Sequence, residues 1–159
     1  MTPQGLWQVN GTRRTALTLF ALLALAACER TPPGTTLSVQ DAAVQLPAVP
    51  GRPGVAYFRV STDGEPARLT GVGSPGLGRV ELHATTTTNG MASMAPLTPD
   101  QLLFDSGTPL VFEPGGKHAM IYDMPRTLKP GARIPLTFTF LSAPPVTVWA
   151  DVRVVGDAG

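Results

Sequence analysis

The sequence predicts an all-β protein with the architecture of an antiparallel Greek-key sandwich or barrel. Glycine and proline, which often mark turns, occur 17 times each among 159 residues. Short segments that alternate between apolar and polar residues recur between these turn formers, as they do in half-buried strands. No long segment has the period of about 3.6 residues that an amphipathic helix requires. About eight or nine short strands joined by tight turns are typical of a Greek-key sandwich.

The first 27 residues are interpreted as an export signal and not as part of this fold. Arg13 and Arg14 precede an apolar run, Thr15–Ala27, which is too short to cross a membrane comfortably. The run ends in Leu-Ala-Ala-Cys, which resembles the lipobox of bacterial lipoproteins, where the signal is cleaved before a cysteine that receives a lipid. The alternative is an ordinary secretory signal with a chance cysteine. Cys28 is the only cysteine, so lipidation is predicted there.

The mature chain is predicted to begin with a tether and to continue as one domain. Residues 28–35 are polar and rich in proline, which is typical of a short linker. Residues 36–156 are expected to form a single β domain, since a chain of this length leaves little room for a second. The lipid would hold this domain at the extracytoplasmic, or periplasmic, face of a membrane in the cell envelope.

Three strands are predicted in the first part of the domain. Leu37–Leu46 is followed by Pro47–Gly54, a loop whose three prolines exclude a central strand. Val55–Thr62 places its apolar side chains Ala56, Phe58 and Val60 on one face and ends at the turn signal Asp63-Gly64. Arg68–Val72 forms a third, shorter strand.

A β-hairpin with a defined register comes next. Arg79–Thr88 is interrupted by Asn89-Gly90, the strongest two-residue signal for a hairpin, and Met91–Ala95 returns antiparallel to it. If Asn89 and Gly90 are the two turn residues, Thr88 pairs with Met91 and Thr85 pairs with Met94.

The remaining chain predicts one loop and four further strands. Pro96–Pro109 is loop-like, with one helical turn at Pro99–Leu103. Leu110–Phe112 and Lys117–Tyr122 are expected to form a second hairpin around Pro114-Gly115-Gly116. The last two strands alternate cleanly, and their predicted inner faces consist of Leu136, Phe138 and Phe140 in one and Val146, Val148, Ala150, Val152 and Val154 in the other.

Charge and motif content exclude several classes of function. Loss of Arg13 and Arg14 with the signal leaves ten basic and eleven acidic residues, a net charge of −1, and no basic patch for nucleic acid. Lipidation of Cys28 leaves no thiol for a disulfide or a thiolate metal site. The chain has no G-x-S-x-G motif and no thiol nucleophile, so an enzyme is not expected.

Histidine and methionine gather in two neighbouring segments. The only histidines are His83 and His118, and the mature chain has four methionines, Met91, Met94, Met120 and Met124. Because side chains alternate along a strand, the hairpin register places Met94 on the face of His83, roughly 7–8 Å away along the diagonal, and Met91 on the other face. The His118-x-Met120 spacing likewise puts both side chains on one face of a strand.

Two strand segments that each present an imidazole and a thioether can converge on a four-ligand metal site. Thioethers are soft donors that favour Cu(I), whereas zinc prefers thiolates or carboxylates beside histidine. A blue-copper site would need a cysteine thiolate. The competing interpretation is a metal-free sandwich in which the methionines fill the core and the histidines lie at the surface. In that case, side chains of the two segments would lie more than about 6 Å apart.

The same residues resemble the PCu(A)C family of periplasmic copper chaperones over roughly residues 39–155. The family pattern is H-x10-M-x21-H-x-M. Ten residues separate His83 from Met94, and His118-x-Met120 matches, while the gap between Met94 and His118 is 23 residues. The two additional residues fall in the Pro96–Pro109 loop, where insertions are easily absorbed.

The resemblance implies a cupredoxin-like fold and a role in copper delivery. His83, Met94, His118 and Met120 would bind one Cu(I) near the surface, with Met124 a weaker candidate and Met91 not a ligand. The implied role is to carry copper to the CuA centre of cytochrome c oxidase, often alongside a Sco-type thiol protein. The alternative function is that of a metal-free envelope lipoprotein that serves as a binding or structural module.

Overall fold

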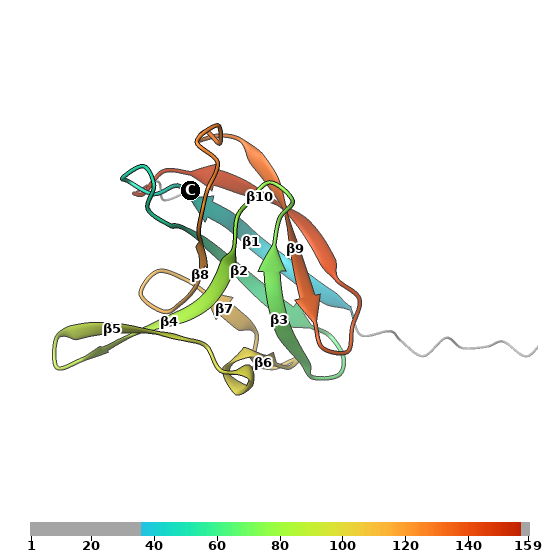
Figure 1. Cartoon of the computed structure of the whole chain (residues 1–159). Coiled ribbons are helices and arrows are strands. Elements are labelled where there is room, and N and C mark those ends of the chain that lie inside the picture. The colour runs from blue at the N-terminus through green and yellow to red at the C-terminus, as the bar shows by residue number, and fades with distance from the viewer. Residues whose placement is uncertain (1–35, 157–159) are drawn as a thin grey trace, which may run out of the picture. The chain divides into compact units, whose positions relative to one another are not determined.

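The computed structural model describes residues 36–156, which form one β domain (Figure 1). The export signal, Cys28 and the tether lie outside the described residues. One short 3-10 turn, Pro99–Leu102, interrupts the strands. The ten strands are β1 (Leu37–Gln45), β2 (Gly54–Thr62), β3 (Ala67–Gly73), β4 (Val80–Thr88), β5 (Met91–Pro96), β6 (Leu103–Phe104), β7 (Leu110–Phe112), β8 (Lys117–Ile121), β9 (Arg133–Phe140) and β10 (Val146–Arg153). The predicted all-β fold class is confirmed.

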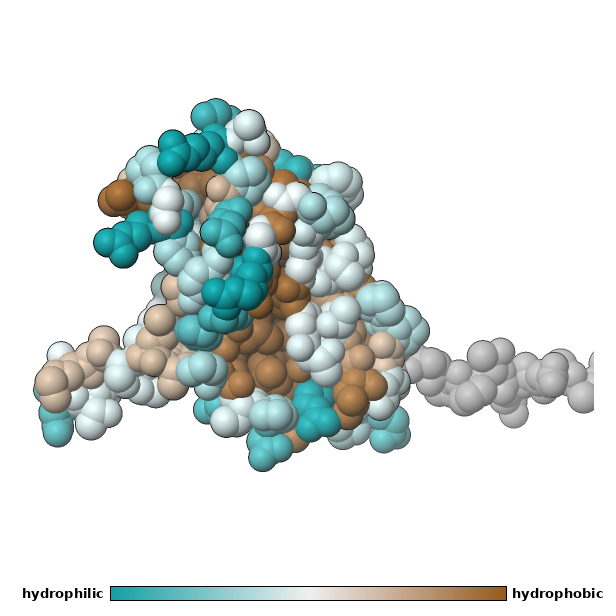
Figure 2. All heavy atoms as spheres, viewed as in Figure 1, coloured by the Kyte–Doolittle hydropathy of each residue, from teal (hydrophilic) through white to brown (hydrophobic). Residues whose placement is uncertain are grey.

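The strands form a single curled sheet in the order β5-β4-β8-β2-β1-β10-β9-β3-β6, with β7 beside β2. β1 and β10 run parallel, and every other pair is antiparallel. β4 and β3 approach each other in space, although no ladder joins them within residues 36–156. Figure 2 shows apolar surface between these two parts of the sheet, at the centre of the view. No helix in this part of the chain is long and apolar enough to span a membrane.

An aromatic cluster holds the core together. The ring of Phe58 stacks on Phe112, with centroids 4.2 Å apart, and meets the edge of Phe138 at 4.7 Å. The predicted inner faces of β2 and β9 are confirmed, since their apolar residues are buried. The prediction for the last strand is wrong at Val154, which lies beyond the end of β10 and is 41% exposed.

The second predicted hairpin is also wrong in its pairing. β7 and β8 both pair with the same edge of β2, β7 with Phe58–Val60 and β8 with Gly54–Ala56. The nine-residue β2 is long enough to take the two short strands end to end. Gly115 adopts a φ of 81° in the turn between them, a conformation that favours glycine. β8 is thereby free to pair with β4 along its other edge.

The β4–β5 hairpin has the predicted register. Asn89 and Gly90 have φ angles of 52° and 78°, as a type I′ turn requires, and Thr85 pairs with Met94. Only residues 80–84 of β4 pair with β8. The outer half of the hairpin is therefore a two-stranded ribbon that projects from the sheet (Figure 1), and every residue of β5 is exposed.

Candidate metal site

The site is built on the outer face of the β4–β8 pair. His83 lies directly opposite His118, and Glu81 lies opposite Met120. Residues opposite each other on antiparallel strands share a face, and residues two apart on one strand do so too. These four side chains therefore lie on one face, while the alternate residues Leu82 and Ala119 pack toward the hydrophobic core. The topology thus brings together the two segments that the sequence analysis left unconnected.

His118 has a defined proton arrangement. Its Nδ1 lies 3.1 Å from the carbonyl oxygen of Gly116, which can only accept a hydrogen bond, so Nδ1 carries the proton. In the neutral imidazole, Nε2 then presents a lone pair, and this atom lies 3.2 Å from Sδ of Met94. Two ligands of one tetrahedral ion, each about 2.0–2.3 Å from the metal, lie roughly 3.5 Å apart. Two electron donors this close together fit a shared metal ion.

His83 lies beside His118, with ring centroids 6.1 Å apart. Its Nε2 lies 3.3 Å from a carboxylate oxygen of Glu81, which fixes a proton on Nε2 and leaves the lone pair on Nδ1. That Nδ1 is buried and has no hydrogen-bond partner. Because a buried polar atom without a partner costs free energy, a nitrogen in this state fits a metal ligand. His83 and His118 are each only 8% exposed.

The two candidate thioethers differ in their surroundings. Met94 is 51% exposed, because it lies on β5, outside the main body of the sheet. Met120 is half-buried on β8, and its Sδ accepts a long hydrogen bond, 3.9 Å, from the hydroxyl of Tyr122. The metal-free alternative expects a gap above about 6 Å between the two segments, and the Nε2–Sδ distance of 3.2 Å is far shorter.

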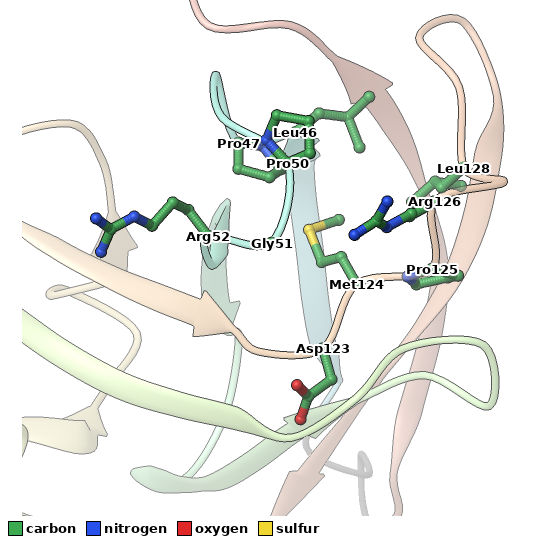
Figure 3. Close-up of a pocket in the computed structure, with 10 residues that line it drawn as sticks. All are labelled: Leu46, Pro47, Pro50, Gly51, Arg52, Asp123, Met124, Pro125, Arg126 and Leu128. Atoms are coloured by element: carbon green, nitrogen blue, oxygen red, sulfur yellow. The ribbon is translucent and has the colours of Figure 1, made fainter.

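Met91 and Met124 lie apart from this cluster. Met91 pairs with Thr88 beside the hairpin turn and is 74% exposed. Met124 lies beyond the end of β8, where a Cβ at Gly54 would overlap its sulfur. There it lines a pocket of about 530 Å³ between the loop after β1 and the loop after β8 (Figure 3).

Three polar residues around the site were not predicted from the sequence. Glu81 contacts His83, Arg79 forms a salt bridge with Glu81, and Tyr122 contacts Met120. Each stands two positions from a candidate ligand or from Glu81, so strand parity alone could have placed them on the same face. Within residues 36–156, no group of three or more His, Cys, Asp or Glu side chains could hold a metal ion.

Comparisons with known proteins agree with this fold. The family model described as "Putative lipoprotein LpqE-like" matches residues 37–152. A comparison with curated proteins finds no match.

Several solved structures are similar to the chain over most of its length. One is the copper-bound PCuAC domain from PmoF2, 22% identical, with a TM-score of 0.55 over 74% of this chain and 92% of that one. The apo PCuAC domain from PmoF1 is 19% identical, with a TM-score of 0.59 over 74% and 93%. The Cu(I) form of DR1885 from Deinococcus radiodurans is 25% identical, with a TM-score of 0.55 over 76% and 78%.

These matches confirm the resemblance seen in the sequence, and the cupredoxin-like fold of the PCuAC domains is the fold of this chain. The chain belongs to the LpqE-like family.

Proposed function

We propose that this protein is an extracytoplasmic copper carrier that binds one Cu(I) through His83, Met94, His118 and Met120. The observation that carries the proposal is the 3.2 Å approach of His118 Nε2 to Met94 Sδ, with Nδ1 held by Gly116. The likeness to the Cu(I) form of DR1885 and to a copper-bound PCuAC domain supports it.

The chemistry of the four ligands determines which metal ion the site prefers. Two imidazoles and two thioethers are neutral and partly soft, and such ligands favour Cu(I) over zinc, magnesium or calcium. A set without a thiolate also has no thiol to oxidise, which suits a site outside the cytoplasm. Lipidation at Cys28 would hold the domain at the periplasmic side of the envelope, near membrane-bound acceptors.

The position of Met94 suits a carrier better than an enzyme. Because this thioether is half-exposed on a projecting hairpin, a ligand from another protein can replace it without opening the core. We expect the recipient to be the CuA centre of cytochrome c oxidase, directly or with a Sco-type protein. When Cu(I)-loaded protein is mixed with a metal-free CuA domain, we expect copper to move to that domain. Retention of all copper by this protein would argue against that recipient.

Copper stoichiometry tests the site most directly. The mature protein, residues 29–159 without lipid, is expected to bind one Cu(I) under reducing conditions, with nitrogen and sulfur in its first coordination shell. Competition with a chromophoric Cu(I) chelator gives the stoichiometry, and X-ray absorption gives the shell. A shell of nitrogen and oxygen without sulfur would contradict the proposal.

Met94 and Met91 form a matched pair of variants, since both are exposed thioethers on β5. Met94→Ala is expected to weaken Cu(I) binding by at least about tenfold, because it removes one of four donors. Met91→Ala is expected to leave the affinity unchanged, because its side chain lies on the other face of the hairpin. Equal effects of the two substitutions on the Cu(I) dissociation constant would contradict the assignment of Met94 as a ligand and of Met91 as a non-ligand.

A further inference from the structure

Three residues outside the proposed ligand set connect two of its members. Arg79 forms a salt bridge with Glu81, and its guanidinium lies 4.3 Å from the ring centroid of Tyr122. The backbone amide of Tyr122 also donates to the carbonyl of Arg79, at 2.8 Å. We call these three residues the Arg79–Glu81–Tyr122 network. It reaches His83 through Glu81 and Met120 through Tyr122.

At one end, the network orients an imidazole. Glu81 accepts the Nε2–H of His83, so that the unpartnered Nδ1 becomes the nitrogen available to a metal. Carboxylates that hold the second nitrogen of a metal-binding histidine fix its tautomer and raise its basicity. Arg79 in turn holds the Glu81 carboxylate, whose side chain is 38% exposed.

At the other end, the network holds the sulfur atom of Met120 in a hydrogen bond. The hydroxyl of Tyr122 donates to Sδ of Met120, and the Arg79 guanidinium over the ring keeps the phenol in place. A thioether sulfur has two lone pairs, and the lone pair that accepts this hydrogen bond points toward Tyr122. Met120 must give up the bond before it can bind a metal through that lone pair.

From these contacts we infer that the Arg79–Glu81–Tyr122 network positions two ligands and has opposite effects on their readiness to bind copper. It fixes the tautomer of His83 that can bind copper, and it holds the Met120 sulfur in a hydrogen bond that competes with copper. The inference rests on the proposed function, because it assigns roles to residues that surround the same site. The contact with Tyr122 therefore lowers the affinity of the Met120 sulfur for copper.

Tyr122→Phe tests the restraint on Met120, because it removes only the hydroxyl and keeps the ring beneath Arg79. We expect the mature protein with this change to bind Cu(I) about two- to tenfold more tightly, the range that one modest hydrogen bond supports. The effect is expected to vanish when Tyr122→Phe is made together with Met120→Ala. An equal effect of Tyr122→Phe with and without Met120 would overturn the inference.

A measurement on the metal-free protein separates this inference from the copper proposal. With ¹³C-labelled methionine methyl groups, Tyr122→Phe is expected to shift the NMR signal of Met120 and to leave that of Met91 unchanged. An unshifted Met120 signal would overturn the inference whether or not copper binds. A shifted signal in a protein that binds no copper would support the contact between Tyr122 and Met120 and contradict the proposed copper binding.

Glu81→Gln tests the other end of the network. We expect Cu(I) affinity to fall by about 10- to 100-fold, the usual effect of losing the residue that orients a metal-binding histidine. The control is Asp100→Asn, which removes one negative charge at an exposed position outside the β4–β8 pair. A similar loss in both variants would assign the effect to net charge and overturn the positioning role of Glu81.

Discussion

Replacement of His118 by alanine is expected to weaken Cu(I) binding by more than about 100-fold. Loss of a residue that only supports a metal ligand typically costs 10- to 100-fold, so loss of a ligand should exceed that range. Nε2 of His118 lies 3.2 Å from Sδ of Met94, and Gly116 holds the proton on Nδ1, the other ring nitrogen.

The measurement is a Cu(I) titration against a chelator of known affinity, with the variant shown to be folded by circular dichroism. Lys117→Ala is the matched control, because Lys117 precedes His118 on β8 and points to the other face of the strand. If His118→Ala binds copper as tightly as the control does, the proposed donor set is wrong.

Truncation of Phe58 to alanine is expected to lower the free energy of unfolding by about 3–5 kcal/mol. Phe58 is only 2% exposed and contacts the rings of both Phe112 and Phe138, so its removal leaves a cavity between three strands. For a domain of this size, such a loss lowers the melting temperature by roughly 10–20 °C.

Thermal unfolding followed by circular dichroism measures this effect. Trp149→Ala is a suitable control, because it also removes a large aromatic side chain, but from a position on β10 that is 58% exposed. We expect the control to shift the melting temperature by only a few degrees. Similar shifts in the two variants would contradict the placement of Phe58 at the centre of the core.

The features that could be predicted from the sequence are those that depend on neighbours in the chain. The Asn89-Gly90 turn determined the hairpin register, and the register separated Met94 from Met91 by strand parity. The spacing of His118 and Met120 placed them on one face for the same reason.

Features that depend on strands distant in the sequence could not be predicted in the same way. The pairing of β8 with β4, which puts His118 opposite His83, follows from the choice of β2 as the partner of β7 and β8. Local patterns favoured a hairpin between β7 and β8 because a Pro-Gly-Gly turn separates two apolar runs. Glu81 and Tyr122 were missed, although strand parity places each on the face of a ligand, because a carboxylate or a phenol two positions from a ligand is not a distinctive motif.

The projecting β4–β5 ribbon divides the proposed ligands between parts of the molecule with different local stability. His83, His118 and Met120 belong to paired strands of the sheet, whereas Met94 lies on an edge strand whose six residues are all exposed. A ribbon with few buried contacts opens at a much lower free energy than the whole domain unfolds. A metal bound to both parts would raise that opening free energy by mass action. Bound copper would thus hold the ribbon against the sheet. Local opening of the ribbon would release the copper while the rest of the domain remained folded.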